Sequence, residues 1–149
     1  MDKVAAKYGY SWKPYEVETE DGWFLTVMRI TAVDGVELSK SEEMADKPPV
    51  FLQHGGLQSG FSWMGEGILG PSLPGALAER GYDVWVGNSR GTKYSNVNRK
   101  DAEGWTLKEH WDFDWSDFGN YDIPAVVETI LEETGKPKVT LIGYSQGSA

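Results

Sequence analysis

Three short, continuous apolar runs constrain the fold of this chain more than any other feature. They are Val50–Leu52, Val84–Val86 and Val139–Ile142. Uninterrupted apolar runs of this length are typical of strands that are buried on both faces, as in a parallel sheet. We therefore predict that the three runs are inner strands of one largely parallel sheet.

Helical patterns separate these runs. Ser72 is suited to cap a helix that has Pro74 in its first turn and stops at Gly81. A second helix is predicted to end at Gly135, because apolar residues before it recur at helical spacing: Ile123, Val126, Val127, Ile130 and Leu131. The alternation of strands and helices predicts an α/β layered fold in which helices cover the sheet.

The N-terminal part is predicted to open with a hairpin. Tyr15–Thr19 and Phe24–Ile30 are rich in β-branched and aromatic residues and flank Glu20-Asp21-Gly22, an Asp-Gly turn signal. The polar stretch Asp34–Pro49 is interpreted as a solvated surface loop. With 149 residues, the chain has the length of one domain.

An aromatic segment, Trp105–Tyr121, comes before the second helix. Trp111, Phe113 and Trp115 alternate with polar residues, which predicts an extended segment that packs one side against the protein. The segment that contains Asp112, Asp114 and Asp117 has neither the glycine nor the closing glutamate of a calcium-binding loop, so no metal site is predicted.

Net charge and composition exclude several kinds of partner and of functional site. A formal net charge of −9 disfavours nucleic acid as a partner. The chain has no cysteine, hence no disulfide or thiolate chemistry, and no apolar run long enough for a membrane span. The start MDKVAAKYGY has no secretory apolar stretch and the chain has no glycosylation sequon, so the compartment is not readable from these residues.

The sequence GYSQG holds the candidate nucleophile, Ser145. A serine hydroxyl must be lifted clear of its surroundings, deprotonated during attack and paired with donors for the resulting oxyanion. Gly143 and Gly147 flank Ser145 at the spacing of a strand-to-helix elbow and follow a predicted buried strand. We predict that they are the elbow glycines.

Two backbone amides are candidates for the oxyanion hole. Gln146 follows the serine, and Gly56 lies in the small-residue loop after the run Val50–Leu52. His54 and Gly55 are predicted to be structural residues of this loop, with His54 orienting it by hydrogen bonding. The alternative for the two glycines is a plain tight turn.

The general base is not evident. Only His54 and His110 are present, and both precede Ser145, whereas hydrolases of this type place the acid and then the histidine after the serine. His110 is predicted to have a partly buried structural role. Asp122, directly before a helical pattern, is interpreted as a helix N-terminal residue rather than as an acid of a triad.

Four stretches in this order resemble the acid lipase family of the α/β-hydrolases, which includes gastric lipase, lysosomal acid lipase and sterol-ester hydrolases. They are YEVETEDGWFLTVMRI, PPVFLQHGGLQSG, GYDVWVGNSRG and WDFDWSDFGNYDIPAVVETI, followed by IGYSQG. The resemblance covers residues 8–149. It implies that Ser145 attacks triacylglycerol or steryl esters through an acyl-enzyme, with Gly56 and Gln146 as oxyanion donors. It also implies no cofactor or metal, transient contact with a lipid interface, and a secreted, lysosomal or membrane-associated lumenal location.

The chain departs from the family pattern at several points. Gly56 stands where the family usually has Leu, and Tyr144 where animal lipases commonly have His. The later strands, the lid-bearing insertion, the triad acid and the catalytic histidine have no counterpart. We therefore expect a single partial domain, 1–149, of the α/β-hydrolase fold, truncated after the elbow strand and inactive alone. The alternatives are a truncated non-catalytic paralogue that binds lipid or a partner, and a serine esterase that is not a lipase.

Overall fold

The computed structural model describes residues 9–38, 47–64 and 72–148, and one mixed sheet organises them. Its seven strands are β1 (Tyr10–Glu18), β2 (Trp23–Val33), β3 (Val36–Glu37), β4 (Val50–Gln53), β5 (Val84–Val86), β6 (Val97–Asn98) and β7 (Thr140–Gly143). The α-helices are α3 (Leu73–Ala78), α4 (Leu107–His110), α5 (Trp115–Asp117) and α6 (Ile123–Thr134). Shorter helical turns are η2 (Gly60–Trp63), η3 (Arg99–Glu103), the π-helical η4 (Phe118–Asp122) and η5 (Ser145–Ser148).

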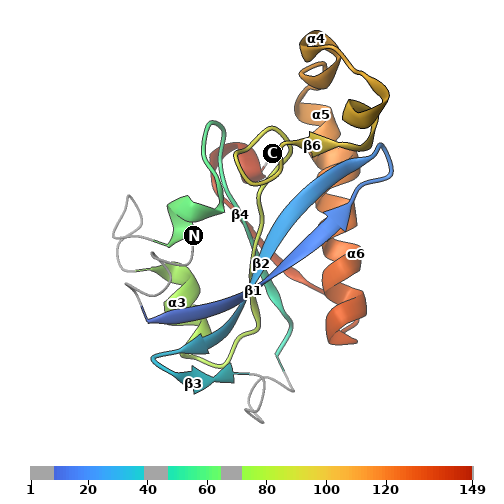
Figure 1. Ribbon diagram of the computed structural model, residues 1–149. Coiled ribbons are helices and arrows are strands. Elements are labelled where there is room, and N and C mark those ends of the chain that lie inside the picture. The colour runs from blue at the N-terminus through green and yellow to red at the C-terminus, as the bar shows by residue number, and fades with distance from the viewer. Residues whose placement is uncertain (1–8, 39–46, 65–71, 149) are drawn as a thin grey trace.

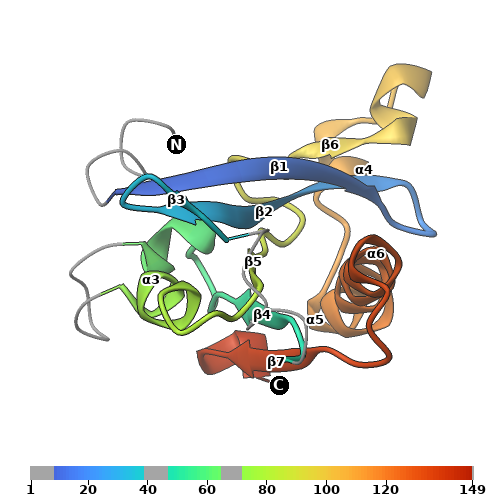
Figure 2. The ribbon, with the colours of Figure 1, turned by 90° about the horizontal axis from the view of Figure 1, so that it is seen from below.

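The sheet has the order β1-β2-β5-β4-β7, with β3 and β6 also paired to β2. β4 is parallel to both β5 and β7, whereas β2 is antiparallel to β1 and β5. Figure 2 shows this order down the sheet, with α3 on one side and α6 on the other. The prediction that the three apolar runs form neighbouring parallel strands is confirmed.

The core lies on both faces of the sheet because the inner strands alternate their side chains. Val50 and Leu52 of β4 belong to the cluster on the α3 side, whereas Phe51 packs with Val126 and Ile130 of α6. β7 differs from its neighbours: Leu141 is 45% exposed, and β4 is the one strand that pairs with β7 in the described ranges. Burial on both faces, which the sequence predicted for all three runs, therefore holds for β4 and β5 but not for β7.

The two predicted helices are present, with one difference at a cap. α3 carries a proline in its first turn, as expected, but the hydroxyl of Ser72 makes no capping hydrogen bond and donates instead to the carbonyl of Trp63 at 3.5 Å. α6 buries Val126 and Ile130 and ends at Gly135, whose φ of 65° is the left-handed conformation that glycine adopts readily.

The N-terminal hairpin is longer than predicted, since β1 and β2 pair from Tyr10–Val33 to Glu18–Phe24 around the Asp21-Gly22 turn. The interpretation of Asp34–Pro49 as a surface loop is wrong for its first residues. Val36–Glu37 pair with the end of β2 and Leu38 is buried, because the chain turns back at Gly35 and continues the sheet. Residues 39–46 of this stretch lie outside the described part of the chain.

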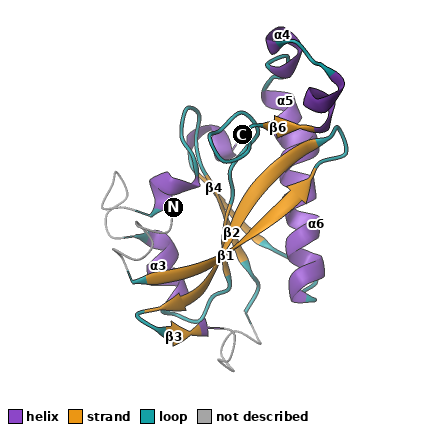
Figure 3. Cartoon of the chain, viewed as in Figure 1, coloured by secondary structure: helices purple, strands orange, loops and turns teal. Residues whose placement is uncertain are grey.

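The aromatic segment is not extended, so that prediction is wrong. Capping boxes at Thr106 and Asp114 start the short helices α4 and α5, and these turns break the alternation of faces. Trp111 and Trp115 are exposed, whereas Phe113 makes edge contacts with Trp23 and Phe118. In Figures 1 and 3 the segment forms a helical arm beside the carboxyl end of the sheet.

Candidate active site

Ser145 stands at a sharp turn between β7 and η5. Its φ is 52°, a left-handed conformation that side chains other than glycine adopt at a cost of about 1–3 kcal/mol. Both flanking glycines lie where a side chain has no room. A Cβ on Gly143 would overlap the carbonyl of Gly147, and a Cβ on Gly147 would lie 2.6 Å from the carbonyl oxygens of Gln53 and His54. The chain can therefore reverse direction at Ser145 only with glycine at both positions.

The loop His54–Gln58, which we call the oxyanion loop, lies directly against this turn. The amide of Tyr144 donates to the carbonyl of Gln53 at 3.1 Å. A Cβ on Gly55 would be 3.1 Å from the Cβ of Ser145, and a Cβ on Gly56 would be 2.5 Å from Oε1 of Gln146. The structure thus brings Ser145, Gly56 and Gln146 together from strands that are distant in sequence. A side chain on Gly55 would be tight, since its Cβ would lie 3.0 Å from the carbonyl oxygen of Tyr144.

His54 is buried and has both ring nitrogens engaged. Its Nε2 accepts the backbone N–H of Ser89 at 3.1 Å, so the ring proton is on Nδ1, which lies 2.8 Å from the carbonyl oxygen of Gly55. Burial lowers the pKa of His54, because a charged imidazole would lose its hydration there. His54 therefore sits in the oxyanion loop as a neutral ring.

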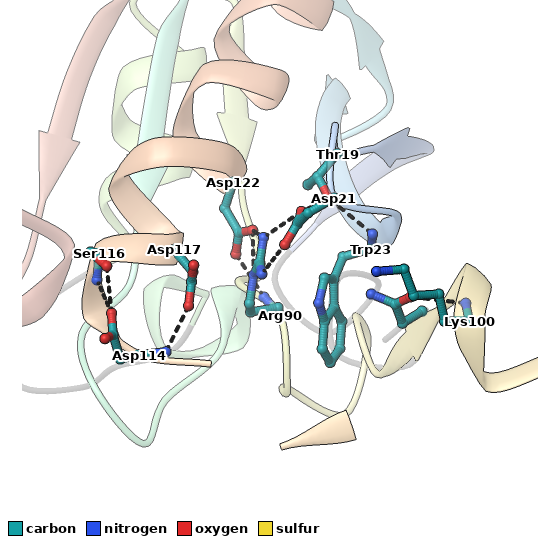
Figure 4. Close-up of polar contacts among 10 residues, drawn as sticks. Thr19, Asp21, Trp23, Arg90, Lys100, Asp114, Ser116, Asp117 and Asp122 are labelled. Atoms are coloured by element: carbon teal, nitrogen blue, oxygen red, sulfur yellow. Dashed lines mark hydrogen bonds and ion pairs between the residues drawn. The ribbon is translucent and has the colours of Figure 1, made fainter. Parts of the chain in front are cut away.

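The turn Asn88–Gly91 after β5 carries a buried arginine. The Nε and backbone N–H of Arg90 donate to Asp122 at 2.8 and 2.9 Å, and its terminal nitrogens donate to Asp21 at 2.5 and 2.9 Å. Figure 4 shows the guanidinium between the two carboxylates, with Trp23 close by. Burial raises the pKa of Asp21, but the hydrogen bonds from Arg90 and Thr19 outweigh this effect and hold the pKa below its usual range.

These contacts correct the interpretation of Asp122. Its side chain makes no capping hydrogen bond to α6, although it lies directly before that helix. It is buried and pairs with the Arg90 guanidinium at 2.8 Å. Burial raises the pKa of Asp122, and the hydrogen bonds from Arg90 only partly offset this effect.

His110 lies outside the elbow. Its ring nitrogens contact Asp101 at 2.8 Å and Asn96 at 3.1 Å, and the ring packs against Trp23. The partly buried structural role predicted for His110 fits this environment. Both histidines of the chain thus have their ring nitrogens in hydrogen bonds to groups other than Ser145.

A cleft of about 790 Å³ opens beside the elbow. The oxyanion loop, the residues Ser89–Gly91 and the residues Gln146 and Gly147 form one part of its lining. An apolar wall forms the other part and consists of Trp111, Phe113, Trp115, Phe118 and Ile123. An elongated apolar ligand that reaches the elbow would lie along this wall.

No cluster of three acidic or histidine side chains that could hold a metal occurs within residues 9–38, 47–64 and 72–148. The aspartates of the arm have other partners: Asp114 and Asp117 form a capping box at α5, as Figure 4 shows. None of the helices described is long and apolar enough to cross a membrane.

Comparison with known families agrees with this geometry. The family model described as the alpha/beta hydrolase fold matches residues 48–149, which include the oxyanion loop and the elbow. A second model, a partial alpha/beta-hydrolase lipase region, matches residues 1–67. The chain belongs to the α/β-hydrolase fold family.

Relatives of this α/β-hydrolase are lipases. Lipase 1 of Drosophila melanogaster is 41% identical over 150 residues, which cover 99% of this chain and 30% of the relative. Gastric triacylglycerol lipase of Rattus norvegicus is 38% identical, with 99% of this chain and 36% of the relative covered. The predicted resemblance to acid lipases is confirmed. The chain spans about a third of the length of these relatives.

The fold of the α/β-hydrolase also matches solved structures. An esterase of Pyrococcus furiosus superposes with a TM-score of 0.61 over 97% of this chain and 46% of the esterase, at 19% identity. At that identity the similarity concerns the fold alone.

Sequence reasoning missed the residues that hold the turn Asn88–Gly91, which reaches the oxyanion loop through Ser89. No local pattern assigns Arg90, Asp21 or Ser89 to the site, although GYDVWVGNSRG, which contains Ser89 and Arg90, resembles the family. The available signal was an arginine in a loop directly after a buried strand, where a charge needs partners. The partners themselves are 32 and 69 residues away, beyond the reach of any local pattern.

Proposed function

We propose that the complete protein containing this chain hydrolyses carboxylic esters of neutral lipids, triacylglycerols or steryl esters, with Ser145 as nucleophile. The observation that carries the proposal is the turn at Ser145, a left-handed serine between two glycines that have no room for a side chain. This turn holds a hydroxyl at the carboxyl end of a parallel strand, the geometry of a nucleophile elbow. Relatives named as triacylglycerol lipases support the substrate class.

In this proposal the reaction runs through an acyl-enzyme. The Ser145 oxygen attacks the ester carbonyl, the alcohol leaves with a proton, and water releases the fatty acid from Ser145. The backbone N–H groups of Gly56 and Gln146 donate to the oxyanion, and the contact between these two residues supports that pairing. No cofactor is needed for these steps.

The general base is proposed to come from a histidine outside residues 1–149. His54 has one ring nitrogen bonded to Gly55 and the other to Ser89, and His110 is bonded to Asp101 and Asn96. The residues that match the relatives amount to about a third of their length, which leaves room for a histidine and its acid elsewhere in the complete protein.

The apolar wall of the cleft is proposed to hold the acyl chain. Trp115 is 72% exposed and Trp111 49%, and both line the cleft. Large exposed aromatics favour contact with a lipid interface, where their apolar rings lose contact with water. From the resemblance to acid lipases, the proposed location of the complete protein is secreted, lysosomal or membrane-associated lumenal.

The test is substitution of Ser145 by Ala in the complete protein, with hydrolysis of trioleoylglycerol and of a soluble short-chain ester as readouts. We expect the loss of about 10⁶-fold in kcat that removal of a serine nucleophile causes, and the loss of labelling by a fluorophosphonate. Activity on the short-chain ester alone would indicate an esterase that is not a lipase. Unchanged hydrolysis in the variant, or lipid binding without any turnover in the wild type, would overturn the proposal.

A further inference from the structure

Each of the four residues of the turn Asn88–Gly91 contacts a different segment of the protein. Asn88 accepts the N–H of Gly60 at the start of η2 at 2.9 Å and donates to the carbonyl of Thr26 in β2 at 2.8 Å. The guanidinium of Arg90 donates hydrogen bonds to the carboxylates of Asp21 and Asp122. Gly91 lies under the apolar wall, since a Cβ there would be 2.8 Å from Phe113 and 2.9 Å from Trp111. The turn is thereby tied to β2, to the start of η2, to the residue before α6 and to the apolar wall.

Ser89 is the residue of this turn that faces the oxyanion loop. Its backbone N–H donates to Nε2 of His54 at 3.1 Å, and its hydroxyl accepts from Nε2 of Gln53 at 2.7 Å. The N–H determines the tautomer of His54, because a nitrogen that accepts a hydrogen bond carries no proton. The proton is therefore on Nδ1, which donates to the carbonyl of Gly55.

That carbonyl belongs to the same peptide unit as the N–H of Gly56. The unit is planar and trans, so its N–H points opposite to its C=O. The hydrogen bond from the His54 ring to the Gly55 oxygen therefore fixes the direction of the Gly56 N–H. It also polarises the peptide, because hydrogen bonds in series strengthen one another, and makes the N–H a better donor. The amide of Gly55 is held independently by Oε1 of Gln58 at 3.2 Å.

We propose that Ser89 and His54 are positioning residues for catalysis: Ser89 holds His54 in its Nδ1–H tautomer, and His54 aims the Gly55–Gly56 peptide so that the Gly56 N–H meets the oxyanion. This inference rests on the proposed function, in which the Gly56 N–H is an oxyanion donor. It adds to that function the device by which the donor is oriented before the substrate arrives.

Two isosteric variants separate the bonds of His54. In His54→Asn the side-chain amide replaces Nδ1–H and keeps the bond to Gly55 but not the bond to Ser89. In His54→Gln the side-chain oxygen replaces Nε2 and keeps the bond to Ser89 but not the bond to Gly55. If His54 aims the peptide, the two variants should differ in kcat. If His54 only fills space, their kcat values should be equal.

The measurement is kcat and KM of the complete protein with a soluble short-chain ester. For His54→Gln we expect kcat to fall about 10- to 100-fold with KM within about twofold, because an oxyanion donor acts on the transition state and a fully lost donor costs about 10²–10³. His54→Asn should retain most of kcat. Ser89→Ala, which leaves Gln53 without its acceptor, should lower kcat by about threefold through a looser loop. Thr129→Val is the matched control, since it loses a part-buried hydroxyl bond within α6 and should not change kcat.

The ¹⁵N resonances of His54 provide a readout in the wild-type protein, and the His54→Gln variant serves only to assign them. Nε2 should be unprotonated and Nδ1 protonated. The opposite tautomer, or equal kcat in the Asn and Gln variants, would overturn the inference. These outcomes are independent of the proposed function, which fails if Ser145→Ala remains active and stands if only the His54 variants behave otherwise.

Discussion

The two turns that meet beside the candidate nucleophile are held by opposite means. The elbow, Gly143–Ser148, depends on missing side chains: its glycines touch backbone atoms, and its links to β4 are backbone hydrogen bonds such as that from Tyr144 to Gln53. The turn Asn88–Gly91 depends on side chains that are present, since Asn88, Ser89 and Arg90 each bond to a distant segment. The elbow should therefore be sensitive to added atoms, and the turn to removed ones.

The largest effect is expected at the elbow, from Gly147→Ala. The new methyl group would lie 2.6 Å from two backbone oxygens, which cannot move without shifting β4, so we expect a loss of about 4 kcal/mol or more in the free energy of unfolding and loss of ester hydrolysis. Urea unfolding and initial rates of the complete protein would measure both.

Gly119→Ala is the control for the elbow variant, because a Cβ on Gly119 meets nothing within 4 Å. If Gly147→Ala were as stable and active as Gly119→Ala, steric exclusion would not be what holds the elbow.

The second-largest effect is expected at the turn Asn88–Gly91, where Arg90→Met should lower the free energy of unfolding. The variant removes the guanidinium from the buried Asp122 and from Asp21, and an unpaired buried carboxylate costs about 3–5 kcal/mol. Arg90→Lys keeps the charge but cannot bond to both carboxylates in a fork, so its loss should be intermediate. Thermal and urea unfolding would rank the three proteins.

A loss below about 1 kcal/mol in Arg90→Met, the size typical of an exposed ion pair, would mean that the turn does not depend on its side chains. The contrast with the elbow would then be lost.

The same contrast explains how far the sequence could predict this site. The elbow and its strand follow from local features, the apolar run before Ser145 and the two glycines, and the comparisons confirm the fold. The loop His54–Gln58 is predicted in the same way, from small residues after the run at 50–52, and the structure places it against the elbow. The side-chain contacts of the turn Asn88–Gly91 were not predictable, because they join Arg90 to Asp21 and Asp122, and Ser89 to His54, across tens of residues.

Errors in the sequence analysis have a related cause. The alternation of Trp111, Phe113 and Trp115 predicted an extended segment, but the capping residues Thr106 and Asp114 start helices there and local hydrogen bonding overrides the alternation. β7 has an apolar run like those of β4 and β5, yet it is more exposed, because burial depends on neighbours that the run itself does not specify. A local sequence pattern thus predicts the type of element more reliably than it predicts the burial of that element.

The smallest expected effect is a difference between the two turns in how their stability depends on pH. Ser145–Ser148 contain no group that titrates near neutrality, whereas the turn at Ser89 bonds to His54, whose pKa burial lowers from its ordinary value of 6.5. As the pH falls below about 6.5, the unfolded chain takes up a proton at this histidine before the folded chain does. The folded state therefore loses stability as pH falls toward the folded pKa, by about 1.4 kcal/mol for each unit of lowering.

Protonation of His54 also removes the acceptor of the Ser89 N–H, so the hydrogen-exchange protection of that amide, corrected for intrinsic rates, should fall over the same pH range. The amide of Gly147, which donates to the carbonyl of Tyr144 at 2.9 Å, should keep its protection until global unfolding. In His54→Gln the acceptor at position 54 does not titrate, so the protection of Ser89 should become independent of pH between about 7 and 5. Parallel loss at both amides in the wild type would mean that the two turns open as one unit, and that side-chain bracing does not set the turn apart from the elbow.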